Sequence, residues 1–145
     1  MSAARNFPAV GPDGLFRLWP DRKVVRWARS ALRNHAERMT READWQALVQ
    51  EFPEHMDLLG VPALQRQIRV LLTAELMAVW LVTCVSAESE ECVSEKNKLL
   101  LTVRDDPDYP PELIVRLAAS LWSDSSRHSH ADAMRRGEAD TRTLN

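Results

Sequence analysis

Four arginines recur along one predicted helix at a spacing that could bind phosphates or carboxylates. They are Arg22, Arg26, Arg29 and Arg33. At about 100° per residue they fall within a band about 60° wide, on the side of the helix away from its apolar residues. Each guanidinium can donate paired hydrogen bonds to one anionic group. We interpret this arginine stripe as a partner-binding surface, against the alternatives of a solvated helix face or pairing with glutamates in 88–95 of the same chain.

A carboxylate and an imidazole lie on the apolar faces of two different predicted helices. Glu75 is one, and His35 is the other, in the middle of the apolar face of the helix that carries the arginine stripe. A buried carboxylate needs a partner or must take up a proton, and Arg69, Arg116 and His35 are the candidates. Glu75 and His35 could act as an acid/base pair or a pH-sensitive switch. We favour a structural role, as buried polar residues that fix the helix register.

The other reactive residue types lack the spacing of a known catalytic or metal site. Cys84 is predicted to be a core residue and Cys92 an exposed thiol, whose neighbouring glutamates disfavour a nucleophilic thiolate. His128 and His130 have no further ligands at fixed geometry. No Ser-His-Asp elbow, Walker loop, HExxH helix or dinucleotide fingerprint is present. We therefore predict a protein without enzymatic activity, metal or cofactor.

The segments that carry these residues are predicted to be helices. The chain has 145 residues, 45% of them hydrophobic, with four glycines against eight prolines, which argues against a turn-rich sandwich or barrel. Helical spacing of apolar residues predicts a helix from Asp21 to about Met39 and a short one from a Thr40 cap to Phe52. A long helix at 62–85 is apolar nearly all round from residue 70 onward, so it is expected to be the central helix.

Two further helices complete the expected fold. One covers 93–103, although the run 99–103 could instead be a short strand, and the last begins at Pro111. We thus expect an all-α protein, a compact bundle of about five helices with its helical domain at 21–123. Residues 124–145 are polar and predicted to be a disordered tail.

The N-terminal residues 1–20 are predicted to be an irregular arm, because they contain three prolines and two glycines. The arm is not plain linker, since Leu15, Phe16 and Trp19 are apolar. These three side chains either fold back over the bundle or form a second contact for a partner. Buried tryptophans contribute strongly to small cores, which favours the first alternative.

The charge is unevenly distributed along the chain. Residues 1–41 hold nine basic and three acidic side chains, whereas 42–105 hold five basic and eleven acidic ones. This asymmetry suggests contact between the two halves, association between copies, or a polyanionic partner for the first half. The apolar run 70–85 contains Glu75 and is short for a membrane span, and the chain does not start like a signal peptide. We expect a cytoplasmic, intracellular protein, with the nucleus left open.

Together these features predict a non-enzymatic helical protein-interaction module, an adaptor or regulator, that binds its partner through the arginine stripe. The alternative is a nucleic-acid-binding or packaging structural protein that self-associates, because a line of arginines also neutralises phosphates of RNA or DNA. We expect the enclosed helix 62–85 to pack against the apolar face of the first helix, which leaves the arginine stripe exposed to solvent. Exposure of that helix, or pairing of the stripe with the chain's own glutamates, would remove this support.

Overall fold

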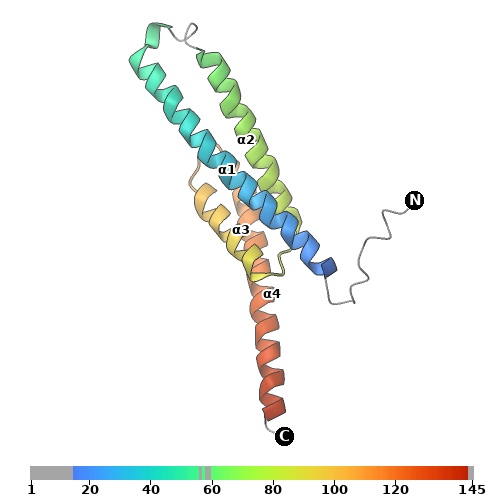
Figure 1. Cartoon of the computed structure of the whole chain (residues 1–145). Coiled ribbons are helices and arrows are strands. Elements are labelled where there is room, and N and C mark those ends of the chain that lie inside the picture. The colour runs from blue at the N-terminus through green and yellow to red at the C-terminus, as the bar shows by residue number, and fades with distance from the viewer. Residues whose placement is uncertain (1–14, 56, 58–59, 144–145) are drawn as a thin grey trace, which may run out of the picture.

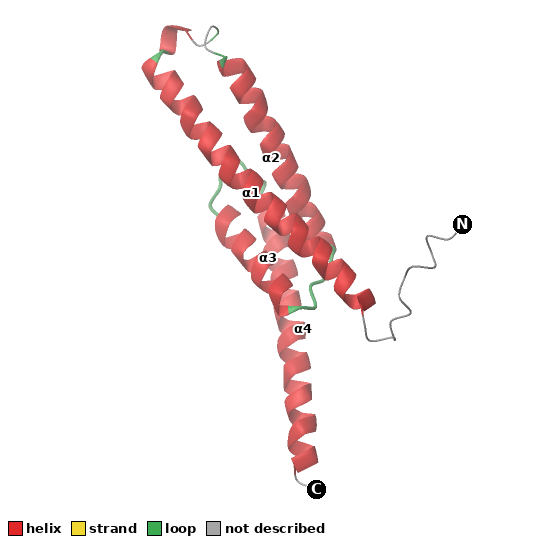
Figure 2. Ribbon diagram, viewed as in Figure 1, coloured by secondary structure: helices red, strands yellow, loops and turns green. Residues whose placement is uncertain are grey.

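The computed structural model describes residues 15–55, 57 and 60–143, with side chains described between 21 and 137. These residues form four α-helices and one short 3-10 turn, without a strand among them (Figure 2). The elements are α1 (Leu15–Glu51), η2 (Pro53–His55), α2 (Val61–Cys84), α3 (Glu90–Val103) and α4 (Pro111–Thr143). The all-α prediction is confirmed, and the segment 99–103 is helical.

The helices form two antiparallel pairs that share one core (Figure 1). α1 and α2 make a long hairpin, closed by η2 and by Gly60, whose φ of 72° is in the left-handed region that favours glycine. α3 and α4 pack against the half of this hairpin that is remote from its loop. α1 and α4 each contact both α2 and α3, so the contacts run around the bundle in the order α1, α2, α4, α3.

The core lies where all four helices meet. On α1, Val24, Ala28 and Ala31 are fully buried at i, i+4 and i+7, and these small side chains allow neighbouring helices to approach closely. The other helices contribute buried valines, leucines, alanine and cysteine: Ala78, Val79, Val82, Cys92, Leu99, Val103, Leu113 and Leu117. Because α1 buries this face, its opposite face points to solvent. That is the face on which the sequence places the arginine stripe.

The predicted break between two helices at Thr40 is absent, which reduces the helix count from five to four. The Thr40 hydroxyl donates to the carbonyl oxygen of Ala36 at 3.2 Å, an i to i−4 bond made inside a continuing helix. A threonine that would cap a helix start can equally make this bond within one. α1 therefore runs through to Glu51.

α2 is not the enclosed central helix that its composition predicts. Val70, Met77 and Trp80 are 67%, 63% and 49% exposed, while the buried positions of α2 lie on its other side. Among the described helices, α2 is also the one long and apolar enough to cross a membrane by length and composition, and 22% of its most apolar window is buried. An enclosed α2 therefore no longer supports the arginine stripe as a partner-binding surface. The exposure of the stripe depends instead on α1 alone, whose opposite face is buried.

Both ends of the described chain are more helical than predicted. α1 begins at Leu15, before Pro20, although a proline beyond the first turn removes a backbone hydrogen bond and disfavours a helix. α4 continues through residues 124–143, where a disordered tail is expected from composition. Ion pairs three or four residues apart, such as Arg127 with Asp124 and Arg135 with Asp132, support this polar helix. The first fourteen residues of the predicted arm lie outside the described residues.

A buried ion pair joins α3 to α4 at the point where the predicted tail would begin. The Lys96 ammonium lies 2.5 Å from Asp124 Oδ2 and donates to Ser120 Oγ and to the carbonyl oxygen of Val85, both at 2.8 Å. Lys96 and Asp124 have almost no exposed surface. All the donors of this ammonium are therefore satisfied, which is the condition for burying a charge at tolerable cost.

Replacing Asp124 by alanine should lower the free energy of unfolding by about 3–5 kcal/mol, because Lys96 would keep a buried charge without its counter-ion. Urea unfolding followed by tryptophan fluorescence measures this loss. The control is Asp132→Ala on the same helix, whose ion pair with Arg135 is exposed and whose removal should change stability by less than about 1 kcal/mol. Equal losses in the two variants would contradict the assignment.

Candidate functional site

The most polar part of the interior surrounds Arg38 of α1. Its Nε donates to Glu75 Oε2, and its Nη2 donates to Glu75 Oε1 at 3.2 Å and to Asp106. Its Nη1 donates to Glu42 at 2.8 Å and to Asp108 at 3.1 Å. The side chains of Arg38 and Glu75 are fully buried. One guanidinium therefore connects α1, α2 and the loop between α3 and α4.

Glu75 receives two further contacts beside Arg38. His35 Nδ1 lies 3.0 Å from Glu75 Oε1, and the Tyr109 hydroxyl donates to the same oxygen at 2.9 Å. The structure thus brings His35 and Glu75 together. Of the other two partners considered from the sequence, Arg116 contacts Trp80 and Thr83 instead, and Arg69 makes no described contact with Glu75.

The electrostatics of this cluster favour fixed protonation states. Burial lowers the pKa of Arg38, but hydrogen bonds to Glu75, Asp106 and Glu42 outweigh it and raise the pKa above its ordinary value. Burial, followed by the Glu75 charge, raises the pKa of Tyr109 well above its ordinary value. Arg38 therefore stays charged and Tyr109 stays a donor. Glu75 is fully enclosed, so its contacts with Arg38, His35 and Tyr109 act as a joint between helices. Glu42 and Asp108, at the edge of the cluster, line a groove of about 500 Å³.

Arg38 and Tyr109 are members of this cluster that are not among the site residues predicted from the sequence. The position of Arg38 carries a signal, because Ala31, His35 and Arg38 follow one another at i, i+4 and i+7 on the apolar face. An arginine there needs an acidic partner. Asp106 and Asp108 lie in the loop between α3 and α4, where no periodic pattern indicates which helix they face.

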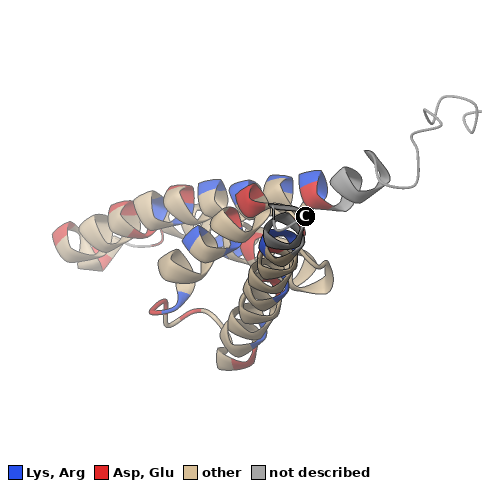
Figure 3. Ribbon diagram, turned by 90° about the horizontal axis from the view of Figure 1, so that it is seen from below, with Lys and Arg blue, Asp and Glu red and all other residues tan. Residues whose placement is uncertain are grey.

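The arginine stripe is exposed, and it lines a groove between α1 and α3 with a volume of about 800 Å³. Lys and Arg recur along α1 in Figure 3. The lining comprises Asp21, Arg22, Val25, Arg26, Arg29, Leu32, Arg33, Ser89 and Glu91. Arg29 donates to Glu91 at 2.9 Å and lies 3.5 Å from Glu95, so the predicted alternative of pairing within the chain holds for this arginine. The other three arginines form no ion pair among the described residues.

Leu15, Phe16 and Trp19, predicted as a second contact, belong to the first turns of α1, directly before the stripe. Their side chains lie outside the described part of the chain, so this contact stays a prediction. In the described residues no group of three or more His, Cys, Asp or Glu side chains is placed to hold a metal ion.

A second surface of a different kind lies between α2 and α4. Its groove has a volume of about 690 Å³ and is lined almost entirely by apolar side chains: Leu76, Met77, Trp80, Leu81, Pro110, Leu113, Val115 and Ala119, with Glu112 and Arg116. The Arg116 guanidinium stacks 4.0 Å above the Trp80 ring centre, and its Nε donates to Thr83 at 2.8 Å. The sequence analysis missed this surface because it placed the whole of α2 inside the bundle.

Comparison of the chain with protein-family models, with curated proteins and with solved structures finds no match in any of the three. Function is therefore argued from the geometry and chemistry of these surfaces.

The two cysteines lie opposite to their predicted environments, since Cys84 is exposed and Cys92 is buried. Cys92 is in the first turn of α3, with Sγ 3.6 Å from the carbonyl oxygen of Asp21. Burial, followed by the Asp21 charge, raises the pKa of Cys92 from 9.0 to about 12. Cys92 is therefore a poor nucleophile mainly because it is buried, and the nearby acidic side chains add to this effect.

Replacing Arg38 by methionine should lower the free energy of unfolding by about 3–5 kcal/mol, because Glu75 would be left buried without its cation. Arg41→Met, three residues further along the same helix, removes a partly exposed arginine whose ion pair with Glu37 lies at the surface, and should change the free energy of unfolding by less than about 0.5 kcal/mol. Chemical denaturation of both variants measures the difference. If Arg38→Met does not fold, Tyr109→Phe, which removes one hydrogen bond to Glu75, should cost about 1 kcal/mol. If Tyr109→Phe leaves the free energy of unfolding unchanged, the structural role of the cluster around Arg38 is contradicted.

Alkaline pH should destabilise the fold through Cys92. The unfolded thiol ionises near 9.0 and the folded one near about 12, so stability is complete below pH 9 and is lost as the pH rises toward 12. Between pH 9 and pH 10 the loss should be about 1 kcal/mol. The Cys92→Ala variant has no thiol to ionise and lacks this loss. The difference between its free energy of unfolding and that of the wild type should therefore narrow by about 1 kcal/mol from pH 9 to pH 10, as measured by urea titration. A constant gap would mean that the thiol ionises equally in both states.

Proposed function

We propose that this protein is a non-enzymatic helical interaction module, an adaptor or regulator, that binds an acidic segment of a partner protein in the groove between α1 and α3. The observation that carries this proposal is the grouping of Arg22, Arg26 and Arg33, exposed and without an ion pair among the described residues, along one concave surface. Arginines a turn apart stand about 5–6 Å from each other. Carboxylates on a partner helix recur at the same interval.

The rest of the groove suits a peptide. Val25 and Leu32 lie between the arginines and give the groove an apolar floor. Arg29 is held by Glu91, which reduces the entropy that this side chain would lose on binding. The N-terminus of α3 is capped by its own chain, because Ser89 Oγ accepts a hydrogen bond from the backbone N–H of Cys92, and Asp21 accepts from the N–H groups of Glu88 and Ser89 directly before the helix. Recognition therefore depends on the arginine side chains.

An acidic protein segment fits this groove better than a nucleic acid does. Asp21 and Glu91 line the groove beside the arginines, and a phosphate backbone, which is charged at every step, would have to pass them. A peptide can place a neutral residue there. Trp27, the aromatic residue nearest the stripe, packs against the core and is only partly exposed, which leaves little for stacking a base.

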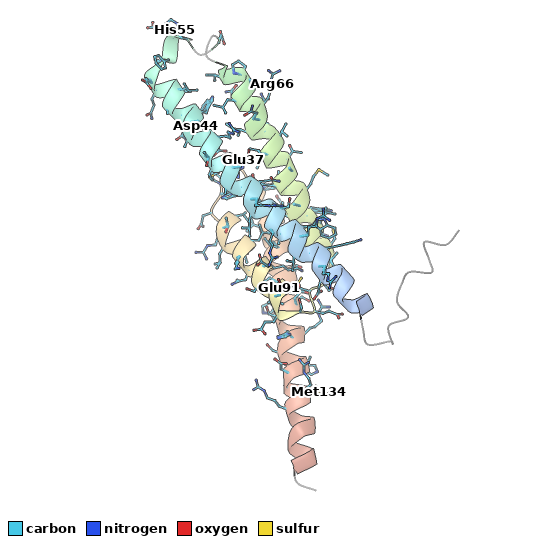
Figure 4. The ribbon with its side chains drawn as sticks, viewed as in Figure 1. Glu37, Asp44, His55, Arg66, Glu91 and Met134 are labelled. Atoms are coloured by element: carbon cyan, nitrogen blue, oxygen red, sulfur yellow. The ribbon has the colours of Figure 1, made fainter. Side chains whose placement is uncertain are left out.

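Reversing two arginines of the stripe tests this proposal against a matched control. Arg26→Glu with Arg33→Glu should weaken binding of a fluorescent helical peptide, with glutamates at i, i+4, i+7 and i+11, by at least about tenfold. Arg66→Glu with Arg69→Glu makes the same charge change on an exposed part of α2 and should alter binding by less than about twofold. In Figure 4, Arg66 lies near the loop end of the hairpin and Glu91 lies on α3. Fluorescence anisotropy measures both affinities, and circular dichroism verifies the fold.

Two results would contradict the proposal. If both double variants weaken binding of the peptide equally, binding responds to the net charge of the protein and does not depend on the arginine stripe. Tighter binding of a short single-stranded RNA or a short DNA duplex than of the peptide, with a steep dependence on salt concentration, would favour the nucleic-acid alternative.

A further inference from the structure

We propose that two copies of this chain associate through the apolar surface between α2 and α4. This apolar surface is defined by the exposed side chains Val70, Met77, Trp80, Leu81, Val115 and Trp122. It lies on other helices than the arginine stripe, so the inference stands independently of the proposed function.

The apolar side chains of this surface recur with the period of a coiled coil. On α2 the spacing alternates between four and three residues, through Val70, Ala74, Met77, Leu81 and Cys84. On α4 the same alternation places Val115, Ala119 and Trp122 on one side. Such a repeat keeps one stripe of a helix facing a partner helix over several turns. Within the chain α2 uses a different face, on which Ala78, Val79 and Val82 are buried.

The surface also supplies both halves of a packing contact. The groove between α2 and α4 can receive side chains, and Met77 and Val115 on its edges are each more than 60% exposed and can be inserted into a facing groove. Arg116 holds the Trp80 ring by stacking on it and is itself bonded to Thr83. The groove is therefore formed before association, which lowers the entropy lost on binding.

The exposed tryptophans supply a substantial part of the area that a stable dimer buries. A tryptophan can bury up to about 250 Å², so the exposed fractions of Trp80 and Trp122, 49% and 74%, amount to roughly 300 Å². A stable dimer buries about 800 Å² on each partner. The two tryptophans alone supply more than a third of this area, before Val70, Met77 and Val115 are included.

Charge at the edge of the groove favours a second copy as the occupant. Glu112 and Arg116 are one turn apart on α4 and both line the groove. A twofold axis between two antiparallel α4 helices places Arg116 of each copy beside Glu112 of the other, because such an interface is self-complementary. The net charge of −2 gives little repulsion between copies. An anionic lipid surface would instead favour basic residues without an acidic one at this edge.

Sizing of the full chain by light scattering tests the inference. The wild type should have twice the monomer mass of 16.5 kDa at micromolar concentration, and Met77→Glu with Val115→Glu should raise the dissociation constant at least about a hundredfold. The control, Phe52→Glu with Leu101→Glu, adds the same charges at exposed apolar positions, one directly after α1 and one on α3. It should remain dimeric.

A charge reversal tests the orientation. Glu112→Arg should weaken the dimer by about tenfold through like charges facing each other, whereas Glu112→Gln, which removes the ion pair but adds no like charge and leaves Arg116 on Trp80, should weaken it by less than about threefold. Equal weakening by the two variants is the outcome that an antiparallel pairing does not allow.

Three results would overturn the proposal. They are a wild-type chain that stays monomeric at all concentrations, equal dissociation by the two double variants, and sedimentation of monomeric chain with phosphatidylglycerol vesicles. Binding of the acidic peptide to the arginine stripe is measured separately on the Met77→Glu, Val115→Glu variant. A failure of dimerisation is thereby distinguished from a failure of the proposed function.

Discussion

The contact of Arg38 with Glu75 is the interaction on which the arrangement of the helices most depends. It is fully buried, and the same guanidinium also holds Asp106 and Asp108 of the loop that joins α3 to α4. Apolar packing has little directionality, so helices rich in alanine and valine could slide or rotate against one another. A charged pair that must be satisfied in one geometry excludes those alternatives. Its place on α1 and α2 determines which faces of both helices remain for solvent or partners.

The cluster around Arg38 also shows how the chain limits the cost of burying charge. Four carboxylates, from Glu42, Glu75, Asp106 and Asp108, surround a single guanidinium. The Arg38 and Glu75 side chains are fully enclosed, whereas those of Glu42 and Asp108 are 27% and 46% exposed. Water can therefore screen the charges of Glu42 and Asp108. Asp106 is only 5% exposed, and it shares the contact with Arg38 and lies 3.6 Å from His35 Nδ1. Tyr109 adds a neutral hydrogen bond to Glu75, and burial keeps that hydroxyl protonated.

The all-α fold could be predicted from periodicity and composition, as could a stripe of arginines opposite the apolar residues of α1. The environment of α2 could not. An apolar helix covered by its own chain and one covered by another molecule have the same composition, and only the positions of Met77 and Trp80 in the structure distinguish them. The role of Arg38 could not be predicted either. It follows four exposed arginines on the same helix, so its residue type alone suggests one more surface arginine. The helix at 124–143 depends on local ion pairs and on the Lys96–Asp124 contact, which apolar periodicity does not register.

The positions of the two proposed surfaces relate them to each other. Contacts run around the bundle in the order α1, α2, α4, α3, so the groove between α1 and α3 and the apolar surface between α2 and α4 lie on opposite sides. A dimer formed through the apolar surface would leave both arginine stripes open to solvent, one on each outer side. Two acidic segments carried by one partner could then bind together, and the second would bind at the high effective concentration set by the length of chain between them. Association between copies would in this way strengthen binding of a partner without any new contact in the groove.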